Sequence, residues 1–121
     1  MRKMMFVVTI ALLMMSALSY ASVNIIGKEG SREFDSSYFP PDKKASYKIM
    51  KARCTQCHTL DRVVQSVVTG VASSSWQPFD QKAAKTYGDR IMRKANKSMT
   101  KDEVTSVVVL MQWLIAEEDK K

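Results

Sequence analysis

The chain has 121 residues, of which 45% are hydrophobic and 26% are charged, and its formal net charge is +7. This length suits one small domain, and the lysines and arginines are scattered instead of forming the dense stripe that nucleic-acid binding requires. The composition therefore excludes a nucleic-acid binder. It indicates a mildly basic protein whose charged partners would be acidic.

The first 21 residues have the three parts of a cleavable export signal. Arg2 and Lys3 form a positive start, residues 4–18 are almost unbroken apolar sequence, and Ser19-Tyr20-Ala21 precedes the expected cleavage point. The apolar run is shorter than the roughly 20 residues of a bilayer-spanning helix. We therefore expect residues 1–21 to be a signal peptide of a bacterial periplasmic protein, with no stable membrane insertion after cleavage.

The rest of the chain predicts an arm followed by one all-α domain. Residues 22–41 mix glycines, serines and two prolines without periodicity, which indicates a loosely ordered arm over 22–40 before a domain at 41–121. A helix should begin at Pro41 and run into residues 54–58, and apolar spacing predicts further helices over 60–71 and from 75 or 77 to 94. Thr100 and Glu103 fit a capping box for a last helix.

The most specific motif is Cys54-Thr55-Gln56-Cys57-His58, a C-x-x-C-H sequence typical of covalent attachment of c-type haem. Cys54 and Cys57 would form thioethers to the two haem vinyl groups. The adjacent His58 would then bind the iron as proximal ligand. The motif predicts one covalent haem c.

A bare dithiol is the alternative explanation of the two cysteines. Exported proteins commonly pair cysteines in a disulfide, and C-x-x-C also occurs in thioredoxin-like redox proteins. Those proteins need βαβ patterning, which this chain lacks, and His58 follows Cys57 directly. The sequence therefore favours haem over a dithiol.

The distal ligand of the iron has to be a residue other than histidine, because His58 is the only histidine in the chain. Methionine is the next choice, and a thioether raises the reduction potential. Met50 lies on the helix that enters the motif, and Met111 lies in the apolar stripe of the last helix. Met92 is favoured over Met99, because Met99 directly precedes the capping threonine, where an apolar residue commonly packs onto the following helix.

Together these residues resemble the small monohaem class I c-type cytochromes, which have the cytochrome c fold. The resemblance covers residues 41–114: a helix ending in the motif, an intervening Trp76, the segment 90–92, and a capped last helix with Trp113. It implies that the first and last helices cross at Ser46 and Trp113. It also implies that the methionine before the final helix is the distal ligand, which adds to the case for Met92.

The sequence departs from that family next to the proximal histidine. No proline closely follows His58 to supply the usual carbonyl for its ring nitrogen, so another acceptor is needed. Trp76 has two possible roles, donation to a haem propionate or anchoring of its loop over the core, and anchoring is the better expectation.

These features predict a periplasmic electron carrier with His/Met axial ligation and no enzymatic activity of its own. Its expected partners are redox proteins with acidic surfaces. Three alternatives remain: a haem-binding ligand sensor, a cytochrome subunit of a larger oxidoreductase, and a haem-free thiol oxidoreductase.

Overall fold

The computed structural model describes residues 23–56, 58–94 and 99–120, with the exception of the Met92 side chain. The predicted signal peptide lies outside these residues. Helices dominate the described part of the chain, which confirms the all-α class. They are α2 (Pro41–Cys54), α3 (Asp61–Thr69), α4 (Gln81–Lys94) and α5 (Lys101–Glu118), preceded by the antiparallel strands β1 (Ile25–Ile26) and β2 (Glu33–Phe34).

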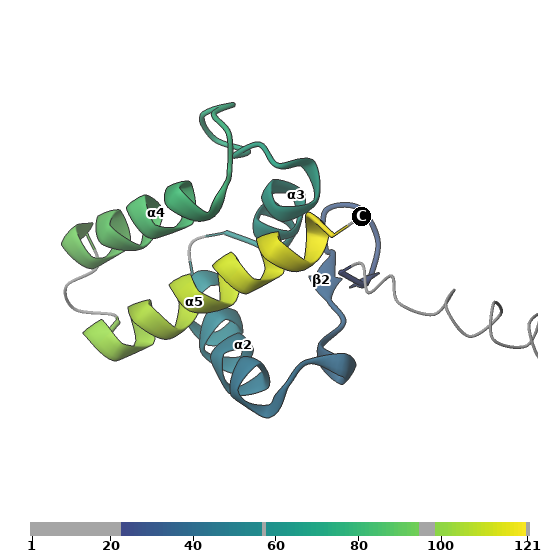
Figure 1. The fold of residues 1–121 in the computed structure, drawn as a ribbon, viewed down its shortest axis with the longest axis horizontal. Coiled ribbons are helices and arrows are strands. Elements are labelled where there is room, and N and C mark those ends of the chain that lie inside the picture. Colours follow the sequence, from purple (N-terminus) through teal and green to yellow (C-terminus); the bar gives the residue numbers. More distant parts are fainter. Residues whose placement is uncertain (1–22, 57, 95–98, 121) are drawn as a thin grey trace, which may run out of the picture.

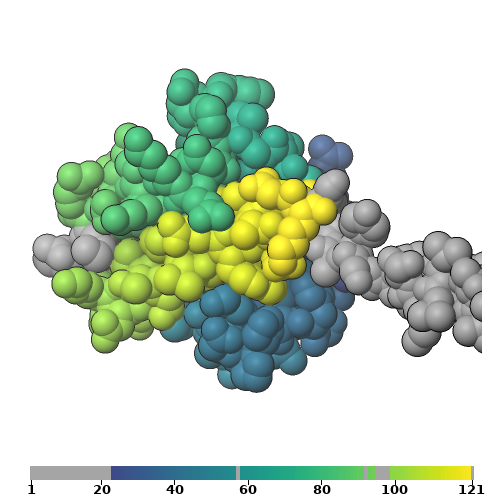
Figure 2. Space-filling model, viewed as in Figure 1, coloured from purple at the N-terminus to yellow at the C-terminus, as the bar shows by residue number. Residues whose placement is uncertain are grey.

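Helix α5 lies at the centre of the domain, with α2 on one side and α4 on the other (Figure 1). In the space-filling view α5 reaches the surface between these neighbours (Figure 2). Its N-terminus has the predicted cap, since the Thr100 hydroxyl accepts a hydrogen bond from the Glu103 amide at 3.2 Å. The buried face consists of Val104, Val107, Leu110, Met111, Leu114 and Ile115.

Helix α2 begins at Pro41, as predicted, because proline has no amide hydrogen to leave unpaired in the first turn. It ends at Cys54, so the motif starts on the last residue of the helix. Tyr47 and Met50 are its buried residues. Helices α2 and α5 contact each other, while their crossing at Ser46 and Trp113 stays a prediction.

Helices α4 and α5 run antiparallel (Figure 1). They come close at Gly88. A Cβ atom at Gly88 would lie 2.1 Å from Cγ2 of Val108, which is closer than two carbon atoms can approach. The close approach of α5 therefore explains why a glycine occupies this position, although glycine weakens a helix.

The prediction of a loosely ordered arm over residues 22–40 is wrong for the residues that the structure describes. Residues 23–40 contain the β1–β2 hairpin and a short 3-10 turn at Ser36–Tyr38. Phe34 is only 1% exposed, and its amide donates to the Tyr47 hydroxyl at 3.0 Å. The strands have two residues each, too short for a period of two to be visible in the sequence.

Candidate functional site

The loop between α2 and α3 carries His58. The ring nitrogen Nδ1 lies 2.9 Å from the carbonyl oxygen of Thr59. A carbonyl can only accept, so Nδ1 donates and the lone pair of Nε2 is available to a metal. The Thr59 carbonyl is thus the acceptor for which the sequence offered no candidate.

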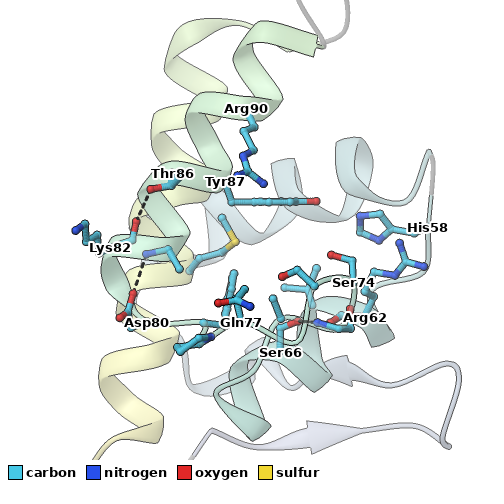
Figure 3. A pocket seen from close by; sticks show the side chains of 18 residues that line it. His58, Arg62, Ser66, Ser74, Gln77, Asp80, Lys82, Thr86, Tyr87 and Arg90 are labelled. Carbon is cyan, nitrogen blue, oxygen red and sulfur yellow. Dashed lines mark hydrogen bonds between the residues drawn. The ribbon is translucent and has the colours of Figure 1, made fainter.

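His58 lines a cavity of about 610 Å³, within the range of roughly 300–1,000 Å³ that is typical of ligand and cofactor sites. Figure 3 shows His58 on one side of the cavity and Tyr87 and Arg90 of α4 on the other. One part of the wall is apolar. Its members are Val63, Ala72, Pro78, Phe79, Ala83 and Met111.

The charged groups around this cavity are mainly basic. Arg62 comes from α3, and Lys82 and Arg90 come from α4, whereas Asp80 supplies the one carboxylate among the described residues that line the cavity. The Asp80 carboxylate accepts from the Ala83 amide at 2.8 Å and so caps the first turn of α4. The cavity therefore combines an apolar wall with an excess of positive charge, which suits an apolar ligand that carries negative charge.

The loop between α3 and α4 forms a third wall of the cavity. It is held by backbone hydrogen bonds from Ala72 to Gln77 at 2.8 Å and from Phe79 to Gly70 at 2.8 Å. Trp76 lies in this loop with φ 59°, a left-handed conformation that is rare for a bulky residue. Its side chain is 82% exposed, so the expectation that Trp76 anchors the loop over the core is wrong.

The methionines occupy different environments. Met50 is fully buried in the core. Met111 is also buried, as expected for a core residue, but it lines the cavity as well, which the helical stripe alone could not reveal. Met99 is partly buried and packs against the core, in agreement with the structural role weighed for it. The backbone of Met92 belongs to α4, while its side chain lies outside the described part of the structure.

Cys54 is the one cysteine that the structure describes, since Cys57 lies outside the described residues. It is partly buried, and burial raises the pKa of its thiol. It also sits at the C-terminal end of α2, where the helix dipole disfavours a thiolate. Reactive redox cysteines have the opposite setting, a helix N-terminus and a lowered pKa.

Comparisons with protein families, with curated proteins and with solved structures found no match. Among the helices within the described ranges, none has the length and apolar character needed to span a bilayer.

Proposed function

We propose that this protein is an exported electron carrier that holds one covalent haem c, with His58 and a methionine as axial ligands. The observation that supports it most is the position of the motif histidine. His58 borders a cavity of cofactor size, and its Nδ1 is engaged by the Thr59 carbonyl, so that Nε2 can serve as a ligand.

The apolar and basic lining of the cavity suits a haem, and Cys54 lies outside that lining, four residues before His58 in the chain. Cys54 and Cys57 would carry the thioethers, and His58 would bind the iron. When bound, the group supplies reversible one-electron transfer between ferric and ferrous iron. Arg62 and Arg90 bring positive charge to the cavity lining, which would offset the two propionates.

The protein's own residues would set the environment of the haem and hence its reduction potential. Val63, Phe79 and Met111 give the cavity an apolar wall that excludes water. The Thr59 carbonyl fixes the orientation of the His58 ring and raises its basicity as a ligand. These are the means by which a protein tunes a haem potential.

Met92 is the distal ligand that we favour, with Met99 as the alternative. Met99 is partly buried against the core next to the α5 cap, so its side chain already has a structural role. Met92 lies in the last turn of α4, the helix that forms one wall of the cavity. This assignment keeps the family resemblance, in which the ligand methionine precedes the final helix.

Helix α4 also offers a surface for acidic redox partners. Its basic residues are Lys82, Lys85, Arg90, Arg93 and Lys94, against the single acidic residue Asp89, so the helix has a net charge of +4. These side chains are exposed, and Lys82 and Arg90 also line the cavity, so this face of α4 would attract an acidic partner toward the haem.

Absorption spectra of protein matured in a host that attaches c-type haem would test the proposal. We expect covalent haem, a ferric band from sulfur–iron ligation, and no carbon monoxide binding by the native ferrous form. Carbon monoxide binding without denaturation would favour the ligand sensor instead. Loss of the sulfur band in Met92→Ala, with the band kept in Met99→Ala, is the expected ligand result, and the reverse would assign Met99.

A further inference from the structure

The turn of the N-terminal hairpin is fastened to α3 by one carboxylate. Oδ1 of Asp61 accepts hydrogen bonds from the Gly30 amide at 3.2 Å, the Arg32 amide at 3.1 Å and the Arg32 Nε at 2.6 Å. Oδ2 accepts from Arg32 Nη2 at 3.2 Å. The Asp61 side chain is 13% exposed. This two-pronged ion pair is a strong and directional kind of contact.

The same carboxylate belongs to the first turn of α3, which directly follows the loop that carries His58. Asp61 is the first residue of α3. The Thr59 carbonyl, two residues earlier, accepts from the Arg62 amide at 3.4 Å and from His58 Nδ1 at 2.9 Å. A contact that fixes the start of α3 therefore also fixes the acceptor that orients the His58 ring.

The hairpin faces the motif loop across a second cavity of about 460 Å³. From the hairpin this cavity is lined by residues 31–33, and from the loop by residues 55, 56 and 58–60. His58 borders both this cavity and the larger one. The hairpin thus lines one of the two cavities that His58 borders, and α4 lines the other.

We propose that Arg32 and Asp61 form a latch that keeps the hairpin closed over residues 55, 56 and 58–60 of the motif loop and acts as a positioning pair for His58. This inference rests on the proposed function, because its consequence is a change in haem potential. Ferric iron carries one more positive charge than ferrous iron, so water near the proximal ligand stabilises the ferric form. A closed latch therefore holds the reduction potential higher than an open one.

The chain offers a matched control for this latch. Lys51 of α2 pairs with Glu33 of the same hairpin at 3.1 Å, but these side chains are 45% and 40% exposed. Exposed pairs of this kind contribute little to stability. The double variants Arg32→Ala/Asp61→Ala and Lys51→Ala/Glu33→Ala each remove one charge of either sign. A difference between them therefore cannot come from net charge.

The experiment compares both double variants with the unmodified haem protein in midpoint potential and in hydrogen exchange at the Arg62 amide. We expect the latch variant to have a lower potential and faster exchange, with the control close to the unmodified protein. Arg32→Lys, which keeps the charge but loses the two-pronged geometry, should shift both quantities in the same direction by less. It provides the test should the double variant fail to fold.

The failures of the two proposals are distinguishable. A chain that matures without haem would refute the electron carrier, and the exchange rates would then test the latch by themselves. A haem protein whose potential and Arg62 exchange are unchanged in the latch variant would refute the latch alone. Faster exchange without a change in potential would refute the influence of the latch on the iron.

Discussion

Replacing Gly88 by alanine tests the close approach of α4 and α5, which bring Arg90 and Met111 to the cavity. The new Cβ would lie 2.1 Å from Val108 Cγ2, and valine in a helix has little freedom to rotate away. Overpacking of this kind costs about 1–3 kcal/mol. Alanine gains about 1 kcal/mol over glycine in helix propensity. The net effect is a loss of up to about 2 kcal/mol in the free energy of unfolding, because the two contributions oppose each other.

The sign of this effect should reverse when Val108 is shortened. In a Val108→Ala background the 2.1 Å contact no longer exists, and the nearest remaining side-chain atoms would be Cβ of residue 108 at 3.6 Å and Cγ1 of Val104 at 3.7 Å, both ordinary van der Waals distances. Gly88→Ala should then stabilise the protein by up to about 1 kcal/mol, the difference in helix propensity. Urea unfolding followed by circular dichroism, with Val108→Ala alone as reference, measures both values. Stabilisation by Gly88→Ala in both backgrounds would refute the close approach.

Three further predictions concern stability. Thr100→Ala should lower the free energy of unfolding by about 0.5–2 kcal/mol through loss of the α5 cap, and Thr100→Ser should restore most of it; equal urea midpoints for all three proteins would contradict this. Burial raises the pKa of Tyr47 to about 12. The contribution of the neutral Tyr47 phenol to the free energy of unfolding is therefore complete below pH 10 and is lost as the pH rises toward 12. Tyr47→Phe should make the urea midpoint less dependent on pH between pH 10 and 12. An unchanged slope of the midpoint against pH would count against this prediction. The hydrogen bond from Arg32 holds the pKa of Asp61 below its ordinary 3.8. The contribution of the Asp61 carboxylate to the free energy of unfolding is therefore present above pH 3.8 and lost as the pH falls through the lower native pKa. This pH dependence should disappear in Asp61→Asn.

The sequence predicted those elements whose signals are local. Pro41 marked the start of α2, and Thr100 with Glu103 marked the start of α5, because a cap involves residues within one turn. Helix α4 begins at Gln81, later than predicted, since residues 71 and 78 pair in a β-bridge and Asp80 supplies the cap.

The sequence predicted only the part of the site that lies within the C-x-x-C-H motif. The C-x-x-C-H pattern of residues 54–58 identified His58 as the candidate iron ligand. The Thr59 carbonyl, which accepts from the His58 ring, is a backbone group that no side-chain pattern reveals. The contact between Arg32 and Asp61 joins residues 29 positions apart, so it depends on the folded path of the hairpin. The cavity position of Met111 likewise follows from how α5 packs and not from its spacing.

Covalent attachment of haem is the central claim, and one measurement tests it directly. The protein is produced in a host with intact c-type haem maturation, unfolded in acid, and examined for mass and for haem absorbance of the separated chain. We predict one haem bound to each chain, retained through denaturation, and lost from the chain in the variant Cys54→Ser/Cys57→Ser. A chain of haem-free mass from the same host would contradict the account.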